Sequence, residues 1–237
     1  MYLNIIKPFF DRFFALVFVL LFWWMYVILA ILVRIKLGSP VLFVQKRPGM
    51  IDRNTGKEKI FKMYKYRSMT NERDSEGNLL SDDIRLTGFG RKLRSTSLDE
   101  LPEVFNILKG DMSFIGPRPQ LVRDMVFMSD RQRMRHTVKP GLSGLAQVMG
   151  RNSISWEEKL DWDLEYVKKI SFLEDLRILV LTLRSVIIRN PEDTEITDDY
   201  GDELLKMGKI SRIMYERKNA EARSILDDLN YETMSVH

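Results

Sequence analysis

Residues 95–120 read STSLDELPEVFNILKGDMSFIGPRPQ. The stretch holds two adjacent carboxylates, Asp99 and Glu100, and then, after a short apolar segment, the tripeptide Pro-Arg-Pro at 117–119. The two prolines restrict the backbone on either side of Arg118. A nucleophilic or metal-binding acid pair beside a rigidly held arginine suits chemistry on a phosphate, because the guanidinium fork matches phosphate oxygens.

Asp99 also has a purely structural interpretation. It is a good N-cap for a helix that runs to about Leu108 and ends at Gly110. Ser97 and Glu100 offer a competing capping box. An aspartate before a helix is usually only a cap, but a helix N-terminus also favours an ionised carboxylate and can bind phosphate oxygens.

The stretch closely resembles the signature of the bacterial sugar transferases, the monotopic polyprenol-phosphate phosphoglycosyl transferases. The resemblance runs from about Lys7 to Asn190, so it rests on more than one motif. It implies transfer of a sugar 1-phosphate from a UDP-sugar to undecaprenyl phosphate, with release of UMP, as the first membrane step of glycan assembly. The similarity is greatest to the small enzymes that transfer a diacetylbacillosamine phosphate or a related N-acetylated sugar phosphate, but the shared motifs do not fix the sugar.

The same resemblance assigns roles to the acid pair. Asp99 is expected to attack the β-phosphorus of the donor and form a covalent aspartyl-phosphosugar, which the acceptor phosphate attacks in a second displacement. Glu100 matches the family's ligand for Mg²⁺, a cation that neutralises a diphosphate and takes only one or two protein carboxylates. Asp111 and Asp175 are weaker metal candidates, since turn and cap roles explain them better.

Basic side chains are expected to hold the phosphates. For any single arginine a surface ion pair is the commoner role, and the uncommon sequence Gly-Pro-Arg-Pro reverses that preference for Arg118. His136 matches a family position that often holds histidine, and we expect it to be structural. The candidate substrate-binding residues are Arg118, Arg151, Arg94, Lys65, Pro117 and Pro119.

Residues 13–33 contain no charged residue, glycine, proline or serine. As a helix they would be about 30 Å long, enough to cross the hydrocarbon core of a bilayer. The segment is too long for the apolar part of a signal peptide and has no small-residue cleavage site, which predicts an uncleaved membrane anchor. A buried core helix is the less favoured alternative.

The path of this anchor has two interpretations. Basic residues flank both ends, so the positive-inside bias favours a helix that enters one leaflet, bends and returns to the cytoplasmic side. The family resemblance implies the same re-entrant path, in which a Ser-Pro pair commonly breaks the helix. Here Trp23 and Trp24 occupy roughly that place, and a helix without proline has no covalent reason to bend. A single-spanning helix therefore stays an alternative.

We predict an α+β protein, in which a helix-rich catalytic domain with a few short strands follows the membrane helix. Residues 1–37 form the anchor, 38–190 the phosphoglycosyl transferase domain and 191–237 an acidic linker and tail. The tail is compatible with a helix, a homodimer contact or disorder. The anchor and the reaction together imply the bacterial inner membrane, with the catalytic domain on the cytoplasmic face.

Local patterns predict the elements of the catalytic domain. Strands or extended segments are expected at 41–45, 60–69 and 145–148, a loop at 47–57, and helices at 89–94, 120–134, 155–170 and 173–190. The last of these helices is apolar over most of its surface, which suits either the core or the membrane surface.

Composition limits the other functions. The chain has 37 Lys and Arg against 33 Asp and Glu, and its lack of cysteine and its two histidines argue against a thiolate or histidine-rich metal site. Two rivals stay open: a membrane-anchored scaffold without catalysis, and a nucleic-acid binder built on basic residues 59–67. No nucleic-acid-binding motif is visible, so nucleic acid is not an expected partner. The expected partners are a UDP-sugar, undecaprenyl phosphate and membrane lipid.

Overall fold

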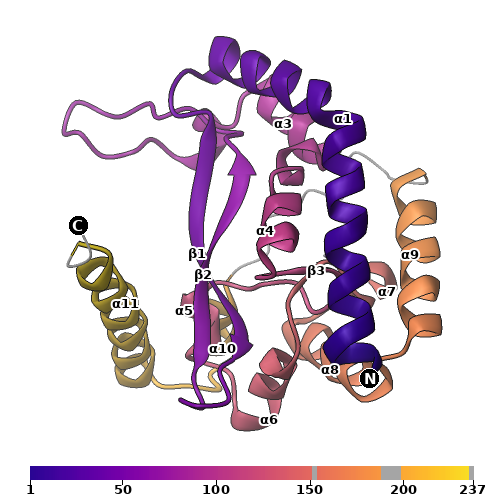
Figure 1. Cartoon of the computed structure of the whole chain (residues 1–237). Helices are drawn as coiled ribbons and strands as arrows, with labels where there is room; N and C mark the ends of the chain where they lie inside the picture. Colours follow the sequence, from indigo (N-terminus) through magenta and orange to yellow (C-terminus); the bar gives the residue numbers. More distant parts are fainter. Residues whose placement is uncertain (151–153, 188–198, 235–237) are drawn as a thin grey trace.

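The computed structural model of the chain describes residues 1–150, 154–187 and 199–234 (Figure 1). A long N-terminal helix and a set of shorter helices surround two small sheets, which confirms the predicted α+β class. The strands are β1 (Leu42–Ile51), β2 (Glu58–Tyr66), β3 (Ser113–Ile115) and β4 (Gly141–Ser143). The α-helices are α1 (Lys7–Leu37), α2 (Asp82–Arg85), α3 (Gly88–Ser95), α4 (Glu103–Lys109), α5 (Val122–Met125), α6 (Asp130–Arg133), α7 (Leu145–Met149), α8 (Trp156–Lys169), α9 (Phe172–Ile187), α10 (Tyr200–Lys206) and α11 (Arg212–Met234). A π-helical turn at Tyr2–Ile6 precedes α1, and 3₁₀ turns lie at Leu98–Glu100 and Met134–Thr137.

The N-terminal helix α1 is long and apolar enough to cross a membrane, and it is bent. Phe22, in its middle, has non-helical dihedral angles (φ −113°, ψ 16°), and Figure 1 shows the helix turning toward β1. No proline or glycine lies nearby, so the bend has no covalent cause in the sequence. The bend falls beside Trp23 and Trp24, at the place where the family resemblance implies a helix break.

Both halves of α1 pack on the rest of the protein, which accounts for the bend. Ala15 in the first half is fully buried against Ile107 of α4 and its neighbours. In the second half, Val33 is fully buried in a separate cluster with Tyr66 and Leu93. The outer face of the helix keeps its large apolar side chains exposed, including Phe9, Phe10, Phe13, Phe14, Leu20, Leu21, Trp23, Trp24, Ile28 and Ile35.

β1 and β2 form an antiparallel hairpin with a bulge between Pro48 and Ile51. The strands predicted at 41–45 and 60–69 are confirmed, with β2 ending at Tyr66. The loop expected at 47–57 is shorter, because residues 47–51 continue β1. The sheet has only two strands, so one edge of β1 has no partner strand. A proline is tolerated on such an edge strand, because a nitrogen that faces the free edge makes no hydrogen bond between strands.

β3 and β4 are short parallel neighbours that join distant parts of the chain. Ser113 pairs with Gly141, and Ile115 pairs with Ser143. The strand predicted at 145–148 is wrong, because these residues form α7 and the strand lies just before them. A short apolar run fits a buried strand or a buried helical turn equally well, so periodicity could not decide between them.

The helix predicted at 120–134 is two short helices, α5 and α6. Ser129 begins the second one: its hydroxyl accepts a hydrogen bond from the Gln132 N–H, and the Gln132 side chain accepts one from the Ser129 N–H. The predictions for α3, α8 and, within the described residues, α9 are confirmed. Ser155 and Glu158 form the same kind of capping box at the start of α8.

The C-terminal segment folds back on the domain as two helices. A turn at Gly208 (φ +67°) separates α10 from α11. Ala222 and Leu226 of α11 pack on α5, and Arg123 of α5 forms an ion pair with Asp202 of α10 (2.9 Å). Most of the predicted acidic linker lies outside the described residues.

Candidate active site

The acid pair lies on a tight turn ahead of α4. Ser97 has a left-handed conformation (φ 55°, ψ 17°), the only positive φ of a non-glycine residue in the described chain, and the 3₁₀ turn Leu98–Glu100 follows it. α4 begins at Glu103, so Asp99 is not its N-cap, whereas the end at Gly110 is as predicted. Strained residues of this kind cluster at functional sites, where the surrounding packing maintains them.

The N-terminal helix α1 contacts both the acid-pair turn and β3, the strand before the Pro-Arg-Pro loop. The Tyr26 hydroxyl donates a hydrogen bond to Leu101 O (3.2 Å), directly after the acid pair, and Leu98 packs against the second half of α1. In the first half, Asp11 accepts a hydrogen bond from the Phe114 N–H of β3 (3.2 Å). The position of the site is therefore fixed relative to the apolar outer face of α1.

The Pro-Arg-Pro loop follows β3, and each of its three carbonyl oxygens accepts a hydrogen bond. The hydrogen bonds run from Gly141 N–H to Pro117 O (3.0 Å), from Arg135 Nη2 to Arg118 O (2.5 Å) and from Arg47 Nη1 to Pro119 O (3.2 Å). The glycine before the loop is required by a close approach, because a Cβ on Gly116 would lie 2.5 Å from Lys139 O. The loop backbone is therefore fixed at each of its three residues.

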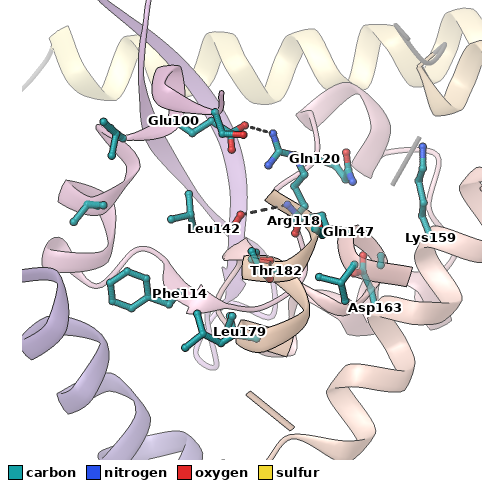
Figure 2. Close-up of a pocket in the computed structure, with 18 of the residues that line it drawn as sticks. Glu100, Phe114, Arg118, Gln120, Leu142, Gln147, Lys159, Asp163, Leu179 and Thr182 are labelled. Atoms are coloured by element: carbon teal, nitrogen blue, oxygen red, sulfur yellow. Dashed lines mark hydrogen bonds and ion pairs between the residues drawn. The ribbon is translucent and has the colours of Figure 1, made fainter. Parts of the chain in front are cut away.

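Glu100 is the centre of the charged part of the site. Its Oε1 atom lies 2.9 Å from Lys65 Nζ on β2 and also forms an ion pair with Arg118 Nη2 (Figure 2). Burial opposes ionisation of Glu100, but the charges of Arg118 and Lys65 outweigh it and hold the pKa of Glu100 well below its usual range. Glu100 in turn raises the pKa of Arg118. The structure thus brings together three of the predicted site residues.

The pKa of Asp99 is shifted in the opposite direction. Burial and the neighbouring charge of Glu100 raise the pKa of Asp99 to about 6, against the charges of Lys65, Arg94 and Arg118. Asp99 is therefore mostly ionised at pH 7 and gains a proton below about pH 6. Two neighbouring acids whose environments separate their pKa values are a common sign of distinct chemical roles.

A third acid, Glu103, completes the group that we call the acid-pair cluster (Lys65, Asp99, Glu100, Glu103 and Arg118). Glu103 is 1% exposed, and its Oε1 lies 3.3 Å from Lys65 Nζ. Burial and the charge of Glu100 raise the pKa of Glu103 to about 7. Glu103 was not among the predicted site residues, although its place three residues after Glu100 was a usable signal, since that spacing brings side chains together on a helical turn.

A cavity of about 540 Å³ opens beside this cluster. Glu100 and Arg118 line its charged end, and Gln147, Lys159 and Asp163 line another side (Figure 2). Asp99 is not on the lining and lies next to Glu100 on the turn, where it is 8% exposed. The charged end of the cavity is therefore formed by the ion pair of Glu100 and Arg118, and Asp99 is the residue next to Glu100 in the chain.

The remaining candidates are distributed around this centre. Arg94 Nε donates a hydrogen bond to Ser68 Oγ (2.8 Å), and its charge acts on Asp99. Arg151 lies outside the described residues. The contacts described for the two weaker metal candidates are elsewhere: Asp111 lies 3.8 Å from Lys59, and Asp175 bonds Lys7, Tyr2 and Tyr166.

Glu100 is the side chain that suits a metal ion. Among the described residues, no group of three or more His, Cys, Asp or Glu is arranged to hold one. Mg²⁺ needs only one or two protein carboxylates when phosphate oxygens and waters complete its shell. The two ion pairs of Glu100 both use Oε1, so Oε2 is the oxygen that they do not use.

A second charge centre, the buried cluster, supports the Arg118 backbone; it consists of Glu58, Arg133, Arg135, His136 and Asp163. Arg135 bonds Asp163 (2.7 Å), and its Nη1 donates to His136 Nε2 (3.1 Å), so Nδ1 carries the His136 proton and donates to Glu58 (3.0 Å). Burial lowers the pKa of His136 to about 4, which keeps the ring neutral and agrees with the expected structural role. Arg135 and Asp163 are 28 residues apart, and no local pattern pointed to them.

Asn106 of α4 is another residue that the sequence analysis missed. Its side chain is fully buried, accepts a hydrogen bond from Tyr64 N–H (3.1 Å) and donates one to Lys62 O (2.7 Å). These two bonds fasten the helix behind the acid pair to the strand that carries Lys65. The signal, one amide in an apolar helix, is too common to be specific.

The family model for bacterial sugar transferases matches residues 2–189. The chain belongs to this family. The resemblance that residues 95–120 indicated is confirmed, and α10 and α11 lie beyond the matched part.

Three relatives place the chain within the family. The "uncharacterized sugar transferase EpsL" of Bacillus subtilis is 52% identical over 156 residues, which cover 66% of this chain and 74% of the relative. The "galactosyl transferase CpsE" of Streptococcus agalactiae is 37% identical over 167 residues, 65% of this chain and 36% of the relative. The "UDP-glucose:undecaprenyl-phosphate glucose-1-phosphate transferase" of Xanthomonas campestris is 35% identical over 198 residues, which cover 78% of this chain and 40% of the relative. The matched part of the chain thus spans less than half of the latter two, and their names agree with the predicted enzyme class.

Proposed function

We propose that this protein transfers a sugar 1-phosphate from a UDP-sugar to undecaprenyl phosphate and releases UMP. The observation that carries the proposal is the pair Asp99 and Glu100, whose pKa values are shifted in opposite directions; Glu100 lines the charged end of the cavity, and Asp99 is its neighbour on the turn. The name of the Xanthomonas relative contains the same donor class and the same acceptor. The sugar itself is left open.

The chemistry runs in two displacements on phosphorus. A carboxylate oxygen of Asp99 forms a bond to the β-phosphorus of the donor, the bond from that phosphorus to the bridging oxygen breaks, and UMP leaves with the electron pair. The phosphate oxygen of undecaprenyl phosphate then attacks the same phosphorus and displaces Asp99. Arg118 and Lys65 neutralise the anionic oxygens during both steps.

Glu100 would hold Mg²⁺ through its carboxylate, together with phosphate oxygens of the donor. When bound, the cation supplies charge neutralisation to the diphosphate. Glu100 suits this role because its pKa is lowered, so its carboxylate stays ionised even at a pH at which Asp99 is protonated. Lys65 and Arg118 then keep the carboxylate in place in the absence of substrate.

The same proposal places the catalytic domain on the cytoplasmic face of the inner membrane, with α1 as a re-entrant helix. Both halves of α1 pack on the domain, so no straight stretch long enough to cross a bilayer leaves the protein surface. Trp23 and Trp24 beside the bend are 62% and 49% exposed, and the bend is the part that would lie deepest in the leaflet. The acceptor phosphate, at headgroup depth, would then lie level with the acid-pair cluster.

Release of UMP tests the reaction. Detergent-solubilised or nanodisc-bound protein is incubated with Mg²⁺, undecaprenyl phosphate and UDP-glucose, UDP-galactose, UDP-N-acetylglucosamine, UDP-N-acetylgalactosamine or UDP-diacetylbacillosamine. We expect UMP from one donor and its loss in Asp99→Asn. UMP release that survives in Asp99→Asn would remove Asp99 as the nucleophile, and no UMP from any donor with folded protein would favour the non-catalytic scaffold.

Cysteine labelling tests the path of α1. The chain has no cysteine, so Asn4→Cys and Ser39→Cys each give one exposed thiol on either side of the helix. A membrane-impermeant maleimide added to inverted inner-membrane vesicles should label both. Labelling of one site only, with the other reached after permeabilisation, would show a single-spanning helix.

A further inference from the structure

One side of the cavity is apolar, and the transfer chemistry proposed above does not use it. Its lining includes side chains from four elements: Phe18 of α1, Phe114 of β3, Leu142 of β4 and Leu179 of α9. Figure 2 shows Phe114 and Leu179 together, on the side away from Lys159. The cavity therefore has a charged end, a polar side and an apolar side.

The apolar side opens toward the apolar outer surface of the protein. Leu179 lines the cavity and is still 42% exposed, so it lies at the rim. Its neighbours on the outer face of α9 are also exposed, with Val180 at 58% and Leu176 at 46%. The first half of α1 runs beside α9 (Figure 1), and Tyr2 and Phe172 join the two at their starts with ring centroids 6.4 Å apart.

We infer that the apolar side, between Phe18 and Leu179, holds the first isoprene units of the polyprenyl phosphate acceptor. This inference rests on the proposed function and adds where the acceptor chain enters. The occupant must carry an anionic group for Arg118 at the charged end and an apolar chain for the apolar side, and it must arrive from an apolar surface.

Polyprenyl phosphate meets all three conditions, and the other candidates do not. A UDP-sugar is polar along its whole length, so its uridine and sugar suit the side formed by Gln147, Lys159 and Asp163. A phospholipid carries a phosphodiester with two chains, whereas the ion pair of Glu100 and Arg118 faces a cavity of about 540 Å³, which suits one chain with a terminal phosphate. The acceptor thus reaches the site sideways from the membrane between α1 and α9.

The two half-reactions separate the acceptor site from the donor site. Leu179→Trp narrows the apolar side, and Leu179→Gln makes it polar; both replace an exposed side chain, so the fold is retained. The matched control is Val180→Trp, next along the same helix, exposed and off the cavity lining. The UDP-sugar found active in the UMP assay is used, with and without undecaprenyl phosphate.

Without acceptor, the single-turnover burst of UMP should be unchanged in all three variants. With acceptor, both Leu179 variants should raise the KM for undecaprenyl phosphate by about tenfold, as expected for the loss of one good apolar subsite, while Val180→Trp matches wild type. An unchanged KM in the Leu179 variants, or an equal loss of the UMP burst, would overturn the inference.

A direct measurement does not depend on turnover. A polyprenyl phosphate with a diazirine on its first isoprene units is photolysed with the wild-type protein, and the adducts are mapped by mass spectrometry. Adducts on peptides containing Phe114 or Leu179, reduced by excess undecaprenyl phosphate and not by phosphatidylglycerol, would support the inference even if no UMP were released. Adducts only on the outer face of α1, or competition by the phospholipid, would overturn it.

Discussion

Arg118 belongs to the acid-pair cluster through its side chain and contacts the buried cluster through its backbone carbonyl, and the two clusters differ in how their charges are matched. In the buried cluster every carboxylate has its own cation or histidine, and despite burial the bonds from His136 and Arg133 lower the pKa of Glu58 to about 2. In the acid-pair cluster the two cations, Lys65 and Arg118, both pair with Glu100. The pKa values of the other two acids, Asp99 and Glu103, are raised. The matched charges hold the loop, whereas the acids with raised pKa values are those that the proposed function assigns to the substrate site.

The largest expected effect comes from the acid-pair cluster. Glu100→Gln keeps the shape of the side chain but removes the charge that pairs with Lys65 and Arg118 and that would hold Mg²⁺. We expect kcat for UMP release to fall by about 10² to 10³. Thermal unfolding of the same variant is the control, and a loss of activity that merely follows a loss of folded protein would contradict the assignment.

The buried cluster should show the reverse pattern. Arg135→Met leaves Asp163 without its cation, and both side chains are at most 3% exposed. Breaking a buried pair of this kind lowers the free energy of unfolding by about 3–5 kcal/mol, measurable by urea unfolding in detergent. Asp163→Asn is the milder control, since an amide can still accept from Arg135. If Arg135→Met were as stable as wild type but inactive, Arg135 would act in the substrate site and not in structural support.

A pH series separates the two raised acids. Asp99 must be ionised to attack, and its pKa is raised to about 6, so the single-turnover rate of UMP release should fall about tenfold per pH unit below pH 6 and level off above it. Glu103→Gln should leave this limb in place, because Glu103 titrates nearer pH 7 and is not the attacking group. If this dependence on pH vanished in Glu103→Gln, Glu103 and not Asp99 would be the acid that causes it.

The smallest effect is expected outside both clusters. Asp111 was a weak metal candidate, but its contact is a surface ion pair with Lys59 at 3.8 Å. Such pairs contribute about 0–1 kcal/mol, so Asp111→Asn should leave the unfolding transition and the Mg²⁺ dependence of UMP release unchanged. A shift in the Mg²⁺ concentration for half-maximal rate would restore Asp111 as a ligand.

The parts of the site that are close in sequence could be predicted from it. Asp99, Glu100 and Arg118 lie in one motif of 26 residues, so a single local pattern and a family resemblance were enough. The support from Arg135, Asp163 and Glu58 depends on contacts between residues 28 to 78 positions apart, which no spacing rule reveals.

The fold shows the same division between local and long-range causes. Capping chemistry located α8 through Ser155, and Gly110 located the end of α4. The bend at Phe22 has no local signal, because it follows from the packing of the two halves of α1 in separate clusters. The predicted strand at 145–148 failed for a related reason, since an apolar run of four residues acquires its conformation from its neighbours.

The most direct test of the central claim is the location of the covalent intermediate. The wild-type protein is mixed with the active UDP-sugar and Mg²⁺ without acceptor, quenched in acid, digested and analysed by tandem mass spectrometry. We expect an adduct with the mass of the sugar phosphate on Asp99, formed in step with UMP and lost when undecaprenyl phosphate is added before the quench. A burst of UMP with Asp99 unmodified, or an adduct on Glu100 or another residue, would contradict it.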